Sequence, residues 1–322
     1  MLLVDSSSAA LLAGGAALLL WAFWMATFKA SGWRFELYSL DFLAGALVAA
    51  LAAFLTLGAL GDGITALDNL AIASGNIVAV ALAAGCVLAL GVMCQLAVAS
   101  AGGMAVAVLI TLSAGFAVHH LLRLAAEPKG NHAGAIAVAL LSLAAVGLAI
   151  AAFHASQREA RGPGIVLGLL GGICFGTMFR LLDVARSDDI DLQPYPLVLL
   201  AAMGALPSGI LYDLFFSNLP IRSKPISLLS YFRGTLVQHA AGIAGGAIWS
   251  LGLLCLILAV HAQPEAGLSA VGGAAIAYGS AVPAALGGVL AGKELADGRG
   301  LNLLRLSMLG LAAAVGLSLL PV

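Results

Sequence analysis

The sequence predicts an all-α membrane protein in which ten transmembrane helices form two inverted five-helix repeats. Three observations lead to this prediction. The composition is 62% hydrophobic and only 9% charged, ten apolar runs are long enough to cross a bilayer, and one short apolar motif recurs half a chain length away. A helix needs about 20 predominantly apolar residues to span the hydrocarbon core, so the runs set the helix count.

The composition identifies lipid as the main solvent. Soluble domains carry about 25% charged residues because their surfaces face water, whereas this chain has 14 basic and 15 acidic side chains among 322 residues. Mean hydropathy is +1.10. The net charge of −1 gives no reason to expect a nucleic-acid partner. The four cysteines lie inside apolar runs without zinc-site or disulfide spacing, so no metal or other cofactor is expected.

The apolar runs are continuous rather than alternating, which favours transmembrane helices over an outer-membrane barrel. The first run lacks a basic leader and a clear small-residue cleavage site, so it is interpreted as a helix and not as a signal peptide. The predicted helices are 8–29, 40–60, 75–98, 101–122, 132–153, 164–185, 196–217, 236–261, 266–291 and 300–320.

The distribution of Lys and Arg predicts the orientation in the membrane. Cytoplasmic loops carry an excess of these residues, and the odd-numbered loops hold nine of them against three in the even-numbered loops. The odd loops are therefore expected in the cytoplasm, with both termini outside the cytoplasmic membrane. The nine residues are Lys29, Arg34, Arg158, Arg161, Arg222, Lys224, Arg233, Lys293 and Arg299.

A recurring motif indicates an internal duplication. GCVLALGVMC at 85–94 resembles GAIWSLGLLC at 246–255, 161 residues later. Both copies fall in the third predicted helix of a five-helix half. Because five is an odd number of crossings, the second half enters from the opposite face, as in the inverted repeats of many transporters. The predicted units are 1–155 and 164–322, joined by a charged cytoplasmic linker at 156–163.

Small residues are abundant, with 40 glycines in the chain. In lipid, glycine and alanine let helix backbones approach closely, and this packing holds a bundle together. Gly and Pro also allow a helix to bend or unwind. The segments ALPSG (205–209) and YGSAVP (278–283) are therefore predicted to break their helices.

Three segments carry a family resemblance: WRFELYSLDFLAG (33–45), SYFRGTLVQH followed by GGAIWSLG (230–239 and 245–252), and GGVLAGKELADG (287–298). They resemble the drug/metabolite transporter superfamily, most closely its branch of glucose/ribose/rhamnose porters and plant ureide permeases. The resemblance implies a secondary transporter that works by alternating access and is often proton-coupled. Related sequences place a polar residue four positions after the glycine of helix three. Here Gln95 follows Gly91 but Leu256 follows Gly252, so the substrate is not carried over.

Aromatic and amide side chains within the helices are the candidate substrate-binding groups. Trp249 and Tyr278 lie mid-helix, where they can stack on a planar or sugar-like ligand. Trp21 and Trp24 lie nearer a helix end and fit either this role or the aromatic belt at the membrane surface. Gln95 has two donors and an acceptor to satisfy in a dry bundle, so it fits substrate binding or a helix–helix hydrogen bond.

Ionisable groups at membrane depth are functional candidates by default. Arg180 and Asp183 are three residues apart, share a helix face and can pair. They fit a substrate contact, a proton-linked switch or a structural ion pair. Asp213, four positions before Ser217, fits a proton site or a polar residue near a helix end.

Several other polar groups are expected at the surface. The pair His119 and His120, and His239 at the start of a helix, are expected to be solvated. The stretch SLLSYFRGTLVQH reads as a short amphipathic piece in the inner interface. Glu294, at the start of the last loop, is expected in a local ion pair.

The sequence therefore predicts a secondary active transporter of a small polar metabolite, such as a sugar, a ureide or a nucleobase, with a proton as coupling ion. Alternatives are an exporter of the same superfamily and a non-transporting accessory subunit. An enzyme is not expected, because no metalloprotease HExxH or clustered acidic motif occurs in the helices. The sequence contains no phosphate-binding GxxxxGK[ST] motif, so ATP-driven pumping by this chain is not expected. Ten helices can enclose a cavity as a monomer, so a monomer is sufficient, and the sequence also allows a dimer.

Overall fold

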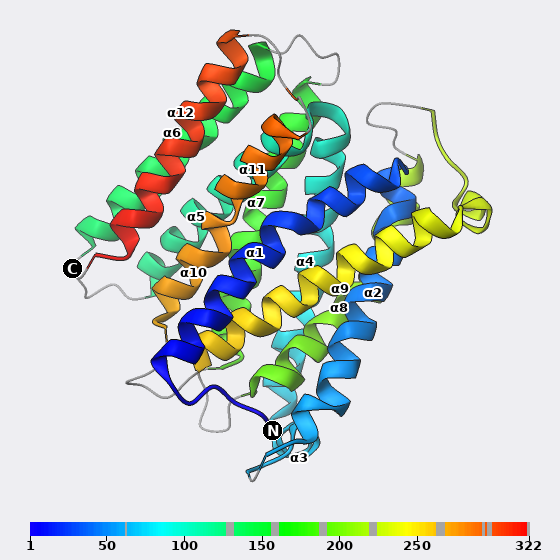
Figure 1. The fold of residues 1–322 in the computed structure, drawn as a ribbon, viewed down its shortest axis with the longest axis vertical. Coiled ribbons are helices and arrows are strands. Elements are labelled where there is room, and N and C mark those ends of the chain that lie inside the picture. The colour runs from blue at the N-terminus through cyan, green and yellow to red at the C-terminus, as the bar shows by residue number, and fades with distance from the viewer. Residues whose placement is uncertain are drawn as a thin grey trace.

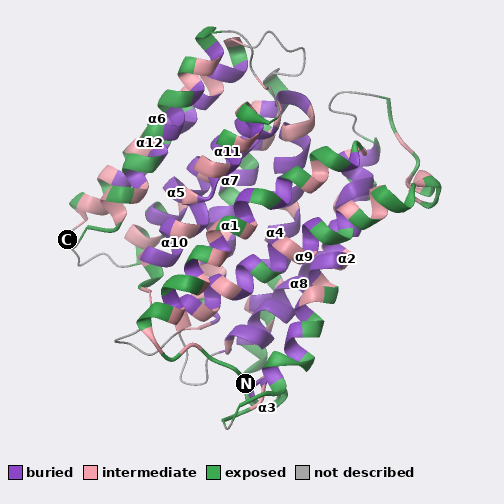
Figure 2. Ribbon diagram, viewed as in Figure 1, coloured by how far each residue is buried: buried purple, intermediate pink, exposed green. Residues whose placement is uncertain are grey.

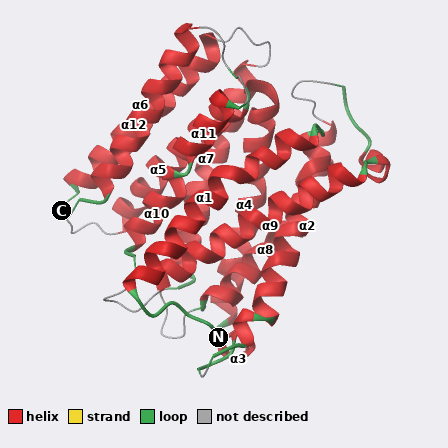
Figure 3. Ribbon diagram, in the orientation of Figure 1, coloured by secondary structure: helices red, strands yellow, loops and turns green. Residues whose placement is uncertain are grey.

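The computed structural model describes residues 1–61, 63–126, 132–155, 161–186, 192–218, 224–261, 268–291, 294 and 298–320. Within these ranges the protein is helical and contains no strand (Figure 3). Ten helical spans are long and apolar enough to cross a membrane. The prediction of an all-α membrane protein with ten transmembrane helices is confirmed.

Most spans are single helices, and shorter helices lie between them. The spanning helices are α1 (Ser7–Ser31), α2 (Phe35–Leu55), α4 (Gly75–Gly102), α5 (Met104–Ala126), α6 (Ala133–Ala155), α7 (Arg161–Val184), α8 (Pro194–Asn218), α9 (Leu236–His261), the pair α10 (Ala270–Gly279) and α11 (Ala281–Leu290), and α12 (Gly298–Ser318). The short ones are η1 (Leu57–Ala59), α3 (Ala66–Ile72) and η2 (Leu228–Arg233).

Local sequence signals fix several helix ends. The Ser6 hydroxyl accepts from the backbone of α1 at its start, and Ser74 does the same for α4. Helix α1 ends at Gly32 with φ 58°, and α4 ends at Gly103 with φ 96°. Only glycine adopts such angles readily. The chain therefore turns from α4 into α5 within one residue.

Helix α2 begins five residues earlier than predicted. Residues 35–39, which lie before the predicted helix, form the first turns of α2. Its two acidic residues, Glu36 and Asp41, are buried. Both have partners, which is the condition for burying a carboxylate in a membrane helix.

Of the two predicted breaks, one is present and one is not. The span 270–290 is divided at Ser280 into α10 and α11, and Pro283 removes the backbone donor that would continue the ladder across this point. The prediction of a break at 205–209 was wrong, because α8 runs through Pro207. Neighbouring helices support α8 here, and Gly204 lies directly against the Leu82 backbone of α4.

The helices pack in related pairs around a buried centre. Helix α1 packs along α9, and α4 packs along α7. Helix α2 also contacts α9 over a long stretch, and α4 contacts α8 in the same way. Helices α6 and α12 lie side by side at one edge of the bundle (Figure 1). Buried residues concentrate where helices face each other (Figure 2). Leu12, Val166 and Phe215 are among the exposed apolar residues.

The glycines of the repeated motif make equivalent contacts. A Cβ added at Gly85 of α4 would collide with the backbone of α8 at the Ala201 carbonyl oxygen. A Cβ added at Gly246 of α9 would collide in the same way with the backbone of α2 at the Phe42 carbonyl oxygen. Each motif therefore places a glycine where its helix meets the second helix of the other half.

At the same two crossings, the partner helices α2 and α8 each contribute a glycine of their own. Gly45 of α2 lies against the Ile243 carbonyl of α9, and Gly204 of α8 lies against the Leu82 carbonyl of α4. The α2–α9 and α4–α8 crossings are thus built from the same kinds of contacts.

Of the predicted linker, residues 156–160 lie outside the described residues and 161–163 belong to α7.

Candidate functional site

Three of the predicted aromatic residues meet in one row at the centre of the bundle. The ring of Trp21 (α1) lies 5.8 Å from that of Trp249 (α9) and 5.9 Å from Phe179 (α7), measured between centroids. Phe179 in turn lies 5.3 Å from Tyr278 (α10). The row joins helices that are far apart in sequence.

Trp24 extends this row through an intermediate ring. Its ring lies 5.0 Å from Phe42 of α2, which lies 6.3 Å from Trp249. The polar atoms of the row bond to backbone. Trp21 Nε1 donates to the Trp249 carbonyl at 2.9 Å, and Tyr278 Oη donates to the Phe175 carbonyl at 3.2 Å. All four predicted aromatic residues are buried, so none belongs to an exposed aromatic belt.

Three buried polar atoms in α4 and α5 have no hydrogen-bond partner among the described residues: Gln95 Nε2, Ser113 Oγ and His119 Nδ1. His119 also contacts the aromatic row, with its ring 6.1 Å from that of Tyr278. Buried polar groups are almost always bonded in folded proteins. Orphaned groups in a membrane bundle therefore mark places where a polar ligand or water can bind.

The prediction that His119 and His120 are solvated was wrong. Both are only 3% exposed. His120 Nδ1 bonds to the Phe116 carbonyl at 3.0 Å, and its ring packs edge-on against Phe116. The burial follows from the position of α5, which contacts α6, α7, α10 and α11.

The carboxylate of Asp183 takes a different partner from the one expected. It forms a salt bridge with Arg186 at 2.6 Å, one turn further along the chain. Arg180 lies close enough to His119 to act on it electrostatically. Asp183 is thus paired with Arg186 instead of the predicted Arg180.

A polar network that the sequence did not reveal lies at the other end of the bundle. Asp41 of α2, 2% exposed, accepts from the Tyr231 hydroxyl of η2 and is paired with His239 Nδ1 of α9 at 2.8 Å. The ring of Trp33 stacks on Tyr231 at 5.8 Å and meets His239 edge-on at 4.9 Å. His239, expected to be solvated, is therefore a partner of a buried carboxylate.

Burial and the neighbouring Asp41 raise the pKa of the Tyr231 hydroxyl to about 12. Tyr231 therefore keeps its proton at physiological pH and remains a donor to Asp41. Close packing supports this arrangement, because a Cβ at Gly242 of α9 would strike the Asp41 side chain. The network ties the first half of the chain to η2 and α9.

Two further buried carboxylates lie near this network. Glu36 is 2% exposed and pairs with Arg34, with distances of 2.6 and 3.3 Å to the guanidinium. Asp213 of α8 is fully buried and accepts from the Ser39 hydroxyl of α2 at 2.6 Å. The partner of Asp213 is therefore on another helix, and not Ser217 of its own.

Two of the segments that carry the family resemblance are brought together here. The stretch 33–45 supplies Trp33, Ser39 and Asp41, and the stretch 230–239 supplies Tyr231 and His239. In the sequence, the resemblance marks these two segments, but nothing pairs their residues. Their pairing is a tertiary contact with no local signature.

The third segment of the resemblance supplies Glu294, which closes a different contact. Its carboxylate pairs with Lys29 at 3.1 Å and accepts from the Ala105 backbone N–H at 2.9 Å, in the first turn of α5. The prediction of a local ion pair at Glu294 was wrong, because its partner Lys29 lies in the last turn of α1. Negative charge at a helix N-terminus is favourable.

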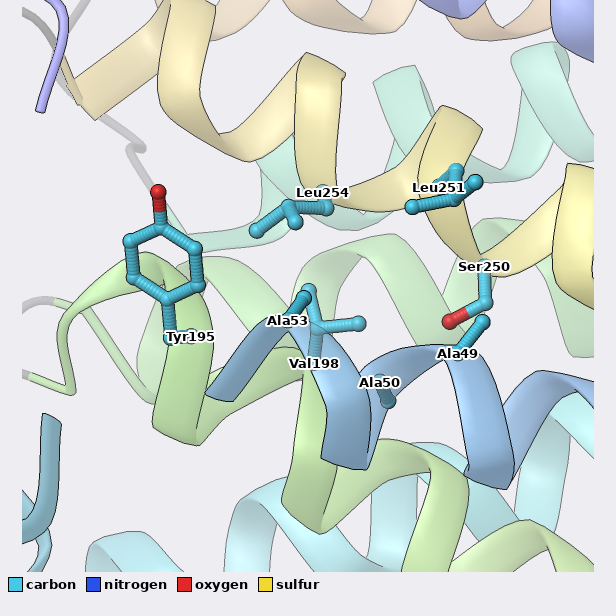
Figure 4. A pocket seen from close by; sticks show the side chains of 8 residues that line it. All are labelled: Ala49, Ala50, Ala53, Tyr195, Val198, Ser250, Leu251 and Leu254. Atoms are coloured by element: carbon cyan, nitrogen blue, oxygen red, sulfur yellow. The ribbon is translucent and has the colours of Figure 1, made fainter. Parts of the chain in front are cut away.

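Described residues of the bundle line a groove and a smaller crevice. A groove of about 560 Å³ runs between α8 and η2, and Leu40, Ile210, Tyr231 and Phe232 form parts of its walls. A crevice between α2, α8 and α9 has no room for a water molecule (Figure 4). Its walls are mainly apolar, so it marks a tight helix junction and not a ligand site.

No protein-family model matches the sequence, and no curated protein matches it. A solved structure described only as "Crystal structure of protein" is similar, with a TM-score of 0.55 and 19% identity. The alignment covers 96% of this chain and 98% of that chain. At this identity the similarity shows the fold alone, and it extends over nearly the whole length of both chains.

Proposed function

We propose that the protein is a secondary active transporter that moves a small polar metabolite across the cytoplasmic membrane by alternating access, coupled to protons. The observation that carries the proposal is the equivalent contact of Gly85 on α8 and of Gly246 on α2. These contacts support two inverted five-helix repeats, an architecture in which one half rocks against the other around a site at their interface.

The aromatic row and the orphaned polar atoms supply a substrate site of the expected kind. The rings of Trp21 and Trp249 lie beside each other between α1 and α9, and Gln95 Nε2 and His119 Nδ1 offer unused hydrogen-bonding capacity. Aromatic walls with a few convergent polar groups are typical of small-molecule sites. A sugar, a ureide or a nucleobase has the flat faces and hydrogen-bonding edges that such a site recognises.

The proposed orientation places both termini outside, so the network around Asp41 lies at the cytoplasmic end. The contacts of Asp41 with Tyr231 and His239, and of Lys29 with Glu294, support a closed cytoplasmic end in this proposal. The proposal includes lipid and a small molecule as partners, and a monomer as the sufficient unit. Export by the same architecture is the second candidate, because nothing in the contacts sets the direction of transport. A non-transporting accessory subunit would leave the orphaned polar atoms without a role.

The test is uptake into proteoliposomes of labelled pentoses, hexoses, allantoin, uracil and amino acids, with and without an inward proton gradient. We expect the gradient to stimulate uptake of one class. Gln95→Leu should then raise KM about tenfold, the loss of roughly one hydrogen bond to a buried group. Leu256→Ala, at the corresponding position of the second half, is the matched control. Movement of no compound in either direction would count against a carrier for these substrates.

A further inference from the structure

Three buried carboxylates lie at the end of the bundle where α2 begins and α8 ends: Glu36, Asp41 and Asp213. They are linked through α2. The Ser39 hydroxyl donates to Asp213 and contacts the Glu36 carbonyl, and Asp41 follows two residues later. They are the acidic side chains that the described part of the chain buries, and they differ in how their charge is compensated.

Two of the three have a cationic partner or a bonded imidazole. Glu36 is held by Arg34 through two contacts, and Asp41 by His239 and the Tyr231 hydroxyl. Among the described residues, the Ser39 hydroxyl is the hydrogen-bond partner of Asp213 and donates to Oδ1. Its other oxygen, Oδ2, is buried without a hydrogen-bond partner among the described residues.

An isolated carboxylate at this depth cannot remain charged at low cost. Burial of an unpaired charge is so unfavourable that the group neutralises instead. One hydroxyl does not replace the water shell of a carboxylate, and Glu36 adds a like charge nearby. The geometry also gives the proton a place, because Ser39 occupies Oδ1 and leaves Oδ2 free.

We propose that Asp213 Oδ2 binds the proton whose movement drives transport. This deepens the proposed transport function and rests on it. While the α2–α8 end is closed, the carboxyl group is neutral. When that end opens, water reaches Oδ2, the O–H bond breaks and the proton leaves as hydronium, which restores the carboxylate. The next proton binds from the opposite side of the membrane while that side is open.

Other groups on the elements that pack against this part of α8 are already engaged or carry no ionic charge. They are Arg34, Glu36, Tyr38 and Asp41 of α2, Tyr231 of η2, His239 of α9 and Cys86 of α4. A hard metal ion such as Ca²⁺ takes six or more oxygen ligands, whereas Asp213 and Ser39 present two oxygens facing each other. The site therefore has too few oxygen ligands for such a metal ion, and it can bind a proton.

The first experiment needs no substrate. Infrared spectra of the purified protein at pH 7 should contain the carbonyl band of a protonated carboxylic acid. Asp213→Asn should remove that band, and Asp183→Asn, which loses a carboxylate paired with Arg186, should keep it. A wild-type spectrum without the band, or a band that survives Asp213→Asn, overturns the proposal.

The second experiment separates the proton from the transport step. With a substrate from the uptake panel, Asp213→Asn should keep substrate exchange within about twofold of wild type. Its gradient-driven accumulation should fall to the equilibrium level. Full accumulation of substrate by Asp213→Asn contradicts the proposal. So does accumulation by the wild-type protein under a sodium gradient that replaces the proton gradient. Loss of exchange as well as accumulation in a folded variant also contradicts it, since Asp213 would then serve substrate binding. An infrared band without any transport by wild type would sink the proposed function while leaving the proton site standing.

Discussion

The indole N–H of Trp21 donates a hydrogen bond to the backbone carbonyl of Trp249 at 2.9 Å. The two rings lie 5.8 Å apart with an interplanar angle of 30°. This contact joins the first helix of the chain to the eighth membrane span, and a Cβ at Gly252 would strike the Trp21 ring. The packing of α1 on α9 is therefore adjusted to one indole.

Trp21→Phe is expected to lower the free energy of unfolding by about 1–3 kcal/mol, because it removes a buried hydrogen bond and part of a packed ring. Thermal unfolding in detergent measures the change. Phe23→Leu, on the same helix but with its side chain 64% exposed, is the control and should leave the midpoint unchanged. Equal midpoints for Trp21→Phe and wild type would show that the indole N–H contributes nothing.

Gly246→Ala should destabilise the protein by about 1–3 kcal/mol, because its Cβ would overlap the Phe42 carbonyl and push α9 away from α2. The same assay compares it with Gly147→Ala in α6, where a Cβ meets nothing within 4 Å. The control should be neutral or slightly stabilising, since Ala is the better helix former. A tolerated Gly246→Ala would mean that the α2–α9 crossing has slack.

The positions of the spans could be predicted from the sequence because hydrophobicity is a local property. Ten runs of about 20 apolar residues correspond to ten observed spans. The start of α2 was missed because hydropathy counts Glu36 as a break, whereas its charge is compensated by Arg34. Whether a proline interrupts its helix likewise depends on the neighbouring helices and not on the local sequence alone. Pro283 divides its span, but Pro207 does not, since α4 supports α8 beside it.

The aromatic residues of the candidate site, and with them Gln95 and Asp213, could be found from residue type and depth, whereas the network around Asp41 could not. Trp21, Trp249 and Tyr278 stand inside apolar runs, where any large ring is conspicuous. Asp41 and His239 lie at run boundaries, where solvated charges are the ordinary expectation. Only the fold, which brings positions 198 residues apart within 2.8 Å, reveals that they are partners.

Tyr231→Phe should destabilise the protein by about 1–3 kcal/mol, because it leaves one oxygen of the buried Asp41 without its donor. Phe232→Leu is the matched control. It changes the next residue of η2, whose side chain is 80% exposed, and should have no effect. Thermal unfolding of the two variants side by side checks the prediction. An undisturbed Tyr231→Phe would indicate that His239 alone satisfies Asp41.

The last prediction concerns orientation, on which the assignment of the Asp41 end to the cytoplasm depends. With the four cysteines replaced by alanine, Gly63→Cys and Lys224→Cys place single thiols at exposed positions in loops two and seven. Because the odd loops carry nine of the Lys and Arg residues and the even loops three, loop seven should face the cytoplasm. A membrane-impermeant maleimide should label the Gly63→Cys variant in intact cells and the Lys224→Cys variant only after permeabilisation. The reverse pattern would turn the molecule over and place the proton release at Asp213 on the outer face. Labelling of both variants in intact cells would put the two loops on one side, which ten crossings of the observed order do not allow.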